Sequence, residues 1–222
     1  TGMAVVKTCE TLRKKICERG AEYLGCSPDD VEFDGEKVVN LKTKEEITRK
    51  EIGNKVMCSS NAPLSATEAF SSPVSPPPFM VGIAEVEIDK ETGVEPIDYA
   101  AVVDCGTVVN PNLARVQTEG GIAQGIGMAL YEDIIYSEKG KNYSNSFMQY
   151  KIPSRLDVGE IRVEFESSYE PTGPFGAKSI GEIVINTPSP AISNAVQNAV
   201  GVIVRELPIT AEKVYKGMAE KE

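Results

Sequence analysis

The chain contains no histidine among its 222 residues. Without histidine, neither Ser-His-Asp nor Cys-His catalysis is available, and no imidazole can hold zinc or iron. The five cysteines are scattered and include no C-x-x-C pair, so their spacing does not indicate a zinc or iron–sulfur site. We therefore expect no metal held directly by protein side chains, and we interpret the cysteines as reduced thiols.

The sequence also lacks long hydrophobic runs and an excess of positive charge. No apolar stretch approaches the roughly 18 residues of a membrane helix, and no signal peptide opens the sequence. The formal net charge of -10 disfavours broad attraction to nucleic acid or to an anionic membrane. We therefore expect a cytoplasmic protein with no nucleic-acid partner and no membrane partner. The hydrophobic content of 41% is sufficient for one large domain or two small ones.

The first third of the chain is predicted to combine two helices with a small hairpin. Apolar residues at helical spacing predict a helix over about residues 3–24, and a more polar helix is expected over about residues 47–55. Val31–Phe33 and Lys37–Leu41 are typical of a short hairpin. Residues 59–78 are rich in serine and proline, which favours an extended crossing over a regular element.

Alternation of apolar and polar residues predicts three longer strands in the rest of the chain. Residues 80–93 and 95–106 are expected to pair as a hairpin, with a turn from Asp89 to Gly93. Glu160–Tyr169 alternates in the same way and is predicted to form a strand.

Two helices are expected among these strands. The first should bury one face, formed by Ile122, Ile126, Ala129 or Leu130, and Ile134. The second should begin at Pro188 with Thr187 as its cap. Because helices and hairpins mix without a regular βαβ alternation, the predicted class is α+β, with mixed β-sheet hairpins and packed helices.

The stretch "TEGGIAQGIG" places four glycines in or beside the first of these helices. A glycine inside a helix costs roughly 1 kcal/mol relative to alanine, so these positions need a reason. Gly120-Gly121 at the start of the helix would leave bare N–H groups that suit a phosphate or another anion. The alternative is close packing of the helix against another element through Gly125 and its neighbours.

The stretch "DCGTVVNPN" is predicted to form a turn between a strand and this helix. Asp104 is expected to brace or cap the turn, and Asn110-Pro111 is a helix-start signal. Cys105 is interpreted as a small buried hydrophobic residue, because no base or cation cluster next to it in the sequence would activate its thiol.

The stretch "GPFGAKSIGE" is a glycine-rich loop that ends on a carboxylate, Glu182. Gly176 and Gly181 permit close approach of the backbone to another group, and Lys178 can neutralise an anion. Glu182 precedes apolar residues, so partial burial is expected, which suits a general base working near neutral pH. The alternative is a surface turn in which Glu182 pairs with Lys178.

Together these stretches resemble the molybdenum-binding subunit of the xanthine dehydrogenase and aldehyde oxidase family, the molybdenum hydroxylases. "PPPFMVGIAEVEIDKETG" is similar to a strand hairpin of that family, and "VVDCGTVVNPNLARVQTEGGIAQGIGMALYED" to its D-x-G, N-P and Q-x-x-G-G-x-x-Q-G segment. "GPFGAKSIGE" resembles the G-A-K-G-[VI]-G-E active-site loop, although the residue after the glutamate is Ile183 where the family commonly has proline. The resemblance covers nearly the whole chain and implies the fold of the C-terminal molybdopterin-binding domain.

The resemblance also implies roles for particular residues. Glu182 takes the position of the catalytic general base. The cofactor-binding residues implied are Gln124, Gly120, Gly121, Ala123, Lys178, Ser179, Ile180 and Gly181. In this family the metal is held mainly by the pterin cofactor, which is molybdopterin or its cytosine dinucleotide, so no protein ligand to molybdenum is expected.

The function implied is oxidative hydroxylation of an electron-poor carbon in a purine, another N-heterocycle or an aldehyde, with water as the oxygen source. We expect the chain to be the C-terminal portion of a molybdenum subunit, with a helix and hairpin part (1–58), a crossing (59–78) and a cofactor-facing part (79–222). The partners expected are the remaining N-terminal part of the subunit and chains or domains that carry iron–sulfur clusters and FAD. The isolated chain is expected to fold, to self-associate, and to lack both cofactor and activity. The alternative is a non-catalytic assembly module or a degenerate paralogue that only docks onto the other half.

Overall fold

The structure is a computed structural model that describes residues 1–59, 63–89 and 93–220. The chain divides into two compact units, Thr1–Pro73 and Val74–Glu222, which are described separately below. Part of the turn predicted between Asp89 and Gly93 lies outside the described residues.

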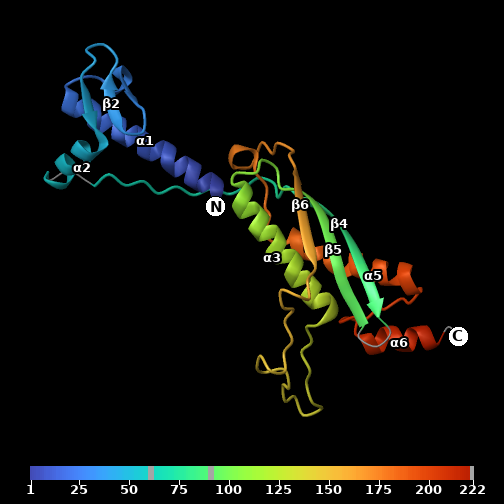
Figure 1. The fold of residues 1–222 in the computed structure, drawn as a ribbon. Helices are drawn as coiled ribbons and strands as arrows, with labels where there is room; N and C mark the ends of the chain where they lie inside the picture. The colour runs from blue at the N-terminus through green and yellow to red at the C-terminus, as the bar shows by residue number, and fades with distance from the viewer. Residues whose placement is uncertain (60–62, 90–92, 221–222) are drawn as a thin grey trace. The chain divides into compact units, whose positions relative to one another are not determined.

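The first unit packs one long helix against a small antiparallel sheet and a second helix (Figure 1). Its elements are α1 (Gly2–Leu24), the short 3₁₀ helix η1 (Pro28–Asp30), β1 (Val31–Phe33), β2 (Lys37–Asn40), β3 (Glu46–Thr48) and α2 (Arg49–Met57). The strands follow the order β1-β2-β3. The buried core of the unit consists of Ile16, Phe33, Val38, Ile47, Ile52 and Val56.

The helix predicted over residues 3–24 and the hairpin after it are confirmed. Gly25 ends α1 in the left-handed conformation with φ of 66°, which glycine adopts without steric cost. The helix predicted over residues 47–55 begins later, at Arg49, because Thr48 and Glu51 form a capping box. The residues just before it form the strand β3, which the sequence analysis did not predict.

Residues 63–78 form neither a helix nor a strand. Part of this segment follows α1: the Lys15 Nζ donates to Ser65 O at 2.6 Å, and the Lys7 ammonium lies 4.9 Å from the centre of the Phe70 ring. The proline-rich stretch is thus extended, as its composition predicts.

The described residues of the second unit form a three-stranded sheet and four α-helices, whose arrangement is seen in Figure 1. The strands are β4 (Phe79–Asp89), β5 (Gly93–Asp104) and β6 (Glu160–Glu166), and the helices are α3 (Pro111–Leu130), α4 (Ile183–Asn186), α5 (Pro188–Val200) and α6 (Ala211–Ala219), with a short 3₁₀ helix η2 (Pro174–Gly176). β4 pairs antiparallel with β5, and β5 pairs parallel with β6, so the sheet is mixed. The predicted α+β class is therefore confirmed.

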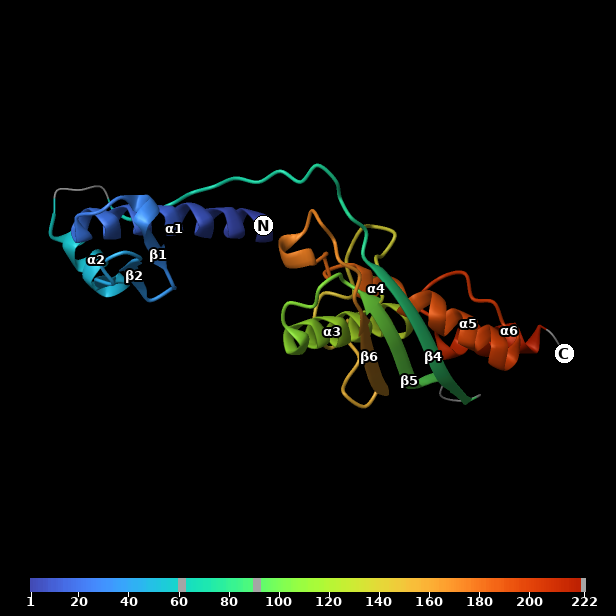
Figure 2. The same ribbon diagram turned by 90° about the horizontal axis from the view of Figure 1, so that it is seen from above.

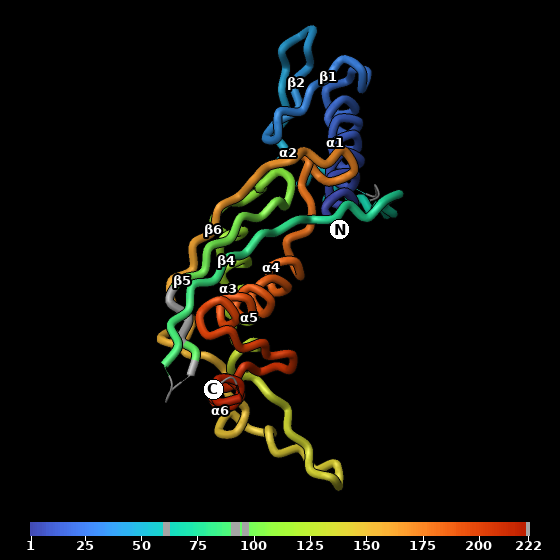
Figure 3. The backbone as a smooth tube through the Cα atoms, turned by 90° about the vertical axis from the view of Figure 1, so that its right-hand side faces the viewer, coloured from blue at the N-terminus to red at the C-terminus, as the bar shows by residue number. Residues whose placement is uncertain are grey.

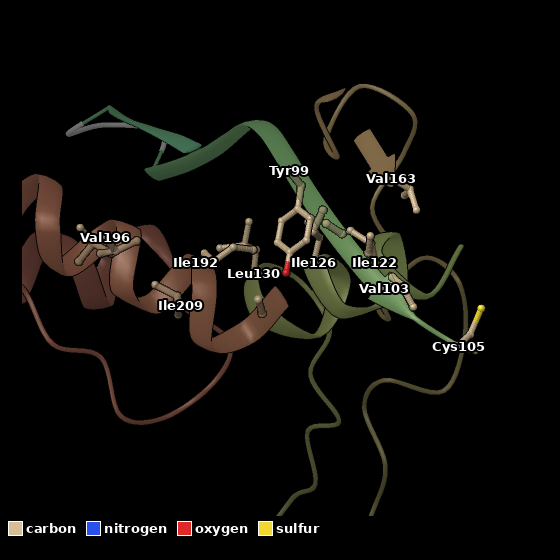
Figure 4. Packing of buried hydrophobic residues seen from close by; sticks show 13 residues of the cluster. Tyr99, Val103, Cys105, Ile122, Ile126, Leu130, Val163, Ile192, Val196 and Ile209 are labelled. Carbon is tan, nitrogen blue, oxygen red and sulfur yellow. The ribbon is translucent and has the colours of Figure 1, made fainter. Parts of the chain in front are cut away.

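The helices of this unit cover one face of the sheet (Figure 3). Tyr99 points from β5 toward Ile126 and Leu130 of α3 and Ile192 of α5 (Figure 4). Its hydroxyl donates to Thr187 Oγ1 at 2.9 Å, so the polar end of this buried ring is satisfied. The other face of the sheet exposes apolar side chains at one end, among them Phe79, Val81, Ile83 and Val102.

Three details of the prediction are wrong. α3 ends at Leu130, so Ile134 lies beyond the helix and is 55% exposed. The strand β6 ends at Glu166 and does not reach Tyr169. Thr187 immediately precedes α5 as predicted, but its side chain makes no capping hydrogen bond, because its backbone is already helical and its hydroxyl is engaged by Tyr99.

A long segment, residues 131–159, connects α3 to β6 without forming a helix or a paired strand beyond one bridge between Tyr136 and Asn142. It exposes large apolar side chains, including Phe147 at 86% and Leu156 at 87%. Among the described residues, no helix is long and apolar enough to cross a membrane.

Candidate active site

The turn that follows β5 and the loop Gly173–Glu182 lie against each other. Gly106 and Ala177 form an isolated antiparallel bridge. The Lys178 amide donates to Cys105 O at 2.7 Å, and the Thr107 amide donates to Gly176 O at 2.9 Å. Two motifs about 70 residues apart in the sequence are therefore joined by backbone hydrogen bonds.

This contact requires glycine on both sides. Gly106 has φ of 68°, and a Cβ there would lie 2.3 Å from Gly176 O. Gly176 has φ of 88°, and a Cβ there would lie 2.4 Å from the ring of Tyr169. Both backbones are in the left-handed region that favours glycine. The close approach predicted for Gly176 is thus an approach to another part of the same chain.

An ion pair with little solvent exposure reinforces the contact. The Lys178 Nζ lies 2.7 Å from Asp104 Oδ2, and the two side chains are only 6% and 17% exposed. The Asp104 carboxylate also accepts hydrogen bonds from the Ser168 hydroxyl at 2.7 Å and the Gly106 amide at 2.9 Å. Burial of Asp104 opposes its ionisation, but the hydrogen bonds from Lys178, Ser168 and Gly106 outweigh it and lower the pKa to about 2.

These contacts settle two predictions about the motifs. The bracing role of Asp104 in its turn is confirmed by its bond to the Gly106 amide, and Cys105 is buried at 4% exposure as expected. The alternative in which Lys178 pairs with Glu182 is wrong, because the ammonium is held by Asp104.

Glu182 lies at the N-cap position of α4 and is exposed. The partial burial expected for it is not found in this chain, because α4 turns Val184 inward and leaves Glu182 facing outward. Val184 is 1% exposed and lies against Gly121 of α3, alongside which α4 runs (Figure 2). In the sequence, the exposed carboxylate thus lies between the half-buried Lys178 and the buried Val184.

The start of α3 is set by Asn110 and Pro111, as the sequence predicts. The Asn110 side chain accepts a hydrogen bond from the Leu113 amide at 3.0 Å, and Pro111 is the first helical residue. Gly120-Gly121 consequently lie inside the helix and not at its start. The bare N–H groups expected there are absent, because amides in a helix interior bond to the carbonyl four residues earlier.

The glycines of α3 serve mainly to pack the helix. A Cβ at Gly121 would lie 2.2 Å from Val184 Cγ2, and one at Gly125 would lie 2.6 Å from Pro188 Cγ. The packing alternative is therefore confirmed for these two residues. Gly120 differs, because a Cβ there would meet no atom within 4 Å.

One face of α3 presents amide side chains next to the loop. Gln117, Gly121 and Gln124 are spaced by four and three residues, so they lie on the same side of the helix. The Gln117 Nε2 donates to Gly181 O at 3.5 Å, directly before Glu182. Gln124 is exposed. Gln117 was not among the predicted site residues, although it takes the first glutamine position of the Q-x-x-G-G-x-x-Q-G segment, and this match and its helical spacing from Gln124 were usable signals.

The other predicted cofactor residues do not all face this side. Gly120 and Ala123 line an open hollow of about 880 Å³ between α3 and the residues before β6. Ile180 is half-buried against the core, whereas Ser179 and Gly181 are exposed. Within the described part of the chain, no three histidine, cysteine, aspartate or glutamate side chains gather to hold a metal ion.

Residues 1–159 match the family described as molybdopterin cofactor-binding domain. The chain belongs to this family. The predicted resemblance to molybdenum hydroxylases is therefore confirmed at the level of the domain.

Two relatives from bacteria match almost the whole chain. A protein of Escherichia coli (strain K12) named probable hypoxanthine oxidase is 35% identical over 98% of the chain and 23% of its own length. The aldehyde oxidoreductase of Megalodesulfovibrio gigas is 30% identical over 98% of the chain and 22% of its own length. The chain thus spans less than a quarter of the length of each relative.

The fold also matches a solved structure, quinoline 2-oxidoreductase from Pseudomonas putida 86. The match has a TM-score of 0.76 and 27% identity, and it covers 95% of this chain and 28% of that one. The molybdopterin-binding fold is therefore shared with oxidoreductases of the xanthine dehydrogenase and aldehyde oxidoreductase type.

Proposed function

We propose that this molybdopterin-binding chain supplies the general base, Glu182, to a molybdenum hydroxylase. The reaction proposed is oxidative hydroxylation of an electron-poor carbon in a purine, another N-heterocycle or an aldehyde, with water as the oxygen source. The observation that carries the proposal is the exposed carboxylate of Glu182 at the start of α4, placed between Lys178, whose side chain is held by Asp104, and the buried Val184.

The residues around Glu182 fit a molybdenum pterin cofactor. A pterin ring carries hydrogen-bond donors and acceptors, and the exposed amides of Gln117 and Gln124 lie on the helix face next to the Glu182 loop. The backbone at Gly181 is open as well, since a Cβ there would meet only Ser179 Oγ, at 3.9 Å. We assign Gln124 and the Ser179–Gly181 backbone to cofactor binding, with Gly120 and Ala123 as a second contact across α3.

The cofactor, molybdopterin or its cytosine dinucleotide, supplies the metal that delivers oxygen and takes up electrons from the substrate. The chain itself contributes positioning and proton transfer. Glu182 accepts a proton through its carboxylate, which is the role of a general base. The glycine at position 181 keeps the approach to that carboxylate free of side-chain atoms.

The remainder of the enzyme is proposed to come from partner chains or domains. The chain covers 23% and 22% of the two relatives, so most of the protein around their cofactors has no counterpart in it. We infer that an N-terminal molybdenum-subunit part completes the site, and that iron–sulfur and FAD units carry the electrons away.

Replacement of Glu182 by glutamine tests the proposal. Glutamine keeps the size and hydrogen-bonding capacity of glutamate but cannot accept the proton, so turnover should fall about 10²–10⁴-fold. The enzyme is purified with its native partner chains, and kcat is measured with hypoxanthine, quinoline and benzaldehyde, with a dye as electron acceptor. Molybdenum content should stay unchanged.

Glu138→Gln is the matched control, because Glu138 is exposed in the segment between α3 and β6. It should leave turnover unchanged. A Glu182→Gln enzyme that retains more than about a tenth of its turnover would falsify the base assignment. No turnover of any substrate by the wild-type complex, together with no bound molybdenum, would favour an assembly module or a degenerate paralogue.

A further inference from the structure

The Lys178–Asp104 pair has the lowest side-chain exposure of the ion pairs in the described residues. The proposed proton transfer does not use it. Apolar residues of similar size often stabilise a fold as well as an ion pair with little solvent exposure does, because desolvation of both charges offsets their attraction. The position of this pair, next to the loop that carries Glu182, therefore calls for another explanation.

Lys178 is held by contacts from several elements. Its ammonium bonds to Asp104, the last residue of β5, and lies 5.3 Å from the ring centre of Phe79, the first residue of β4. Its backbone amide donates to Cys105 O at 2.7 Å. Asp104 is in turn fixed by Ser168, which follows β6. One lysine is thus anchored where all three strands of the sheet come together.

Glu182 lies four residues after Lys178, which is the first anchor of the loop, and two residues before a second anchor. The second anchor is Val184, which is 1% exposed and packs on Gly121 of α3. Between the anchors, Ser179 and Gly181 are exposed and only Ile180 reaches the core. Besides the contact of Ile180, the segment between the anchors has the long hydrogen bond from Gln117 Nε2 to Gly181 O, at 3.5 Å. The path of the segment, and with it the direction of the carboxylate, therefore depends strongly on the two anchors at its ends.

We propose that the Asp104–Lys178 pair is a positioning device that fixes the loop in the course that presents Glu182 to the reacting centre. This inference rests on the proposed function, in which Glu182 is the general base. Lys178 and Asp104 are positioning residues, since neither reaches the outward-facing site itself. An ion pair with fixed donors defines a position more sharply than an apolar contact of the same size.

The first test measures loop order in the 222-residue chain, without cofactor. Lys178→Met keeps most of the side-chain volume and leaves Asp104 with its Ser168 and Gly106 donors. Hydrogen exchange at the Thr107 and Lys178 amides should become at least tenfold faster relative to amides within β5. The control is Arg162→Met, which removes an ion pair to Asp98, another residue of β5 that is also 17% exposed. Arg162→Met should leave hydrogen exchange at the Thr107 and Lys178 amides unchanged.

The second test uses the complete enzyme and separates positioning from cofactor binding. Lys178→Met and Asp104→Asn should each lower kcat about 10- to 100-fold, with KM and molybdenum content kept, because a small displacement of a catalytic group has effects of this size. In a Glu182→Gln background, Lys178→Met should cause no further loss, since it acts only through Glu182.

The outcomes separate the two proposals. Unchanged hydrogen exchange of the loop amides in Lys178→Met, or an equal loss of kcat by Lys178→Met with and without Glu182→Gln, overturns the positioning role. Loss of molybdenum in Lys178→Met but not in Asp104→Asn also overturns it, because Lys178 would then bind the cofactor directly. Full turnover in Glu182→Gln with faster loop exchange in Lys178→Met overturns the proposed base, and leaves the pair as a loop anchor.

Discussion

The glycines named in the three glycine-containing stretches, "DCGTVVNPN", "TEGGIAQGIG" and "GPFGAKSIGE", form two groups that differ in what surrounds them. Gly106, Gly121 and Gly176 lie so close to other parts of the chain that an added Cβ would approach an atom to between 2.2 and 2.4 Å. Gly120 and Gly181 belong to the same motifs, yet a Cβ at either position would meet open space or one atom at 3.9 Å. Packing within this chain explains why the first group must be glycine. It gives no reason for glycine in the second group.

This difference distinguishes glycines that the fold needs from glycines that can serve function, even when both lie in the same motif. A glycine-rich loop next to a catalytic glutamate suggests that every glycine makes room for a cofactor. In this molecule Gly106 makes room for the backbone carbonyl of Gly176, and Gly176 makes room for the ring of Tyr169 and the hydroxyl of Thr107. Gly120 and Gly181 have open space around them, so at these two positions the missing side chain can make room for a cofactor or a partner chain.

The largest loss in the free energy of unfolding is expected when a glycine of the first group is replaced by alanine. Gly106→Ala places a Cβ 2.3 Å from a backbone carbonyl at φ of 68°, and we expect a loss of about 3 kcal/mol in the free energy of unfolding. Urea unfolding of the 222-residue chain, followed by circular dichroism, measures this loss.

Gly140→Ala is its control, because Gly140 has φ of 76° but nothing within 4 Å. It should cost only the roughly 1 kcal/mol of the left-handed backbone. Equal losses in the two variants would show that the contact between the two motifs contributes nothing to stability, and the comparison of the two groups would fail.

A smaller effect is expected from the carboxylate that holds the same turn. The pKa of Asp104 is lowered from 3.8 to about 2, so its ionised form stabilises the fold above about pH 4, and this contribution is lost as the pH falls toward 2. Asp104→Asn should lower the free energy of unfolding by about 2 kcal/mol at pH 7.

The pH dependence provides the check on this second prediction. The difference between wild type and Asp104→Asn should be constant from pH 7 to about pH 5 and should shrink below about pH 4. Asp98→Asn should lower the free energy of unfolding less than Asp104→Asn does, because its partner Arg162 is 61% exposed and solvent screens that pair. A difference that stays constant down to pH 2.5 would contradict the shift in the Asp104 pKa.

Sequence patterns predicted the long elements of this chain and, from the turn at Asp34-Gly35, the short hairpin of β1 and β2, but they did not predict β3, α4 or α6. Eight or more residues of clear periodicity located α1, β4, β5 and α3, since each repeats its apolar face several times. β3 has three residues and α4 has four, which is too few for any period to show. α6 has Thr210 as its cap, with Val214 one turn further on, but its small apolar face was overlooked.

The site was harder to predict because its decisive contacts span the sequence. The nearest acidic candidate partner for Lys178 was Glu182, four residues away, whereas its actual partner, Asp104, is 74 residues away. The outward direction of Glu182 depends on α4, which buries Val184 instead. Both outcomes are decided by tertiary packing, which local propensity does not encode.

The smallest effect on stability, and the sharpest test of the second group of glycines, is expected from Gly181→Ala. Gly181 has open space around its Cα, so the variant should change the free energy of unfolding of the 222-residue chain by less than about 0.5 kcal/mol. In the complete enzyme the added methyl group should lower molybdenum content or kcat at least tenfold, because it occupies the approach to Glu182. Gly53→Ala in α2 is the control: nothing lies within 4 Å of that position either, and it belongs to the other unit. It should leave both molybdenum content and kcat unchanged. If Gly181→Ala behaves like Gly53→Ala in the complete enzyme, the open glycines are merely exposed, and the backbone at position 181 has no part in binding the cofactor.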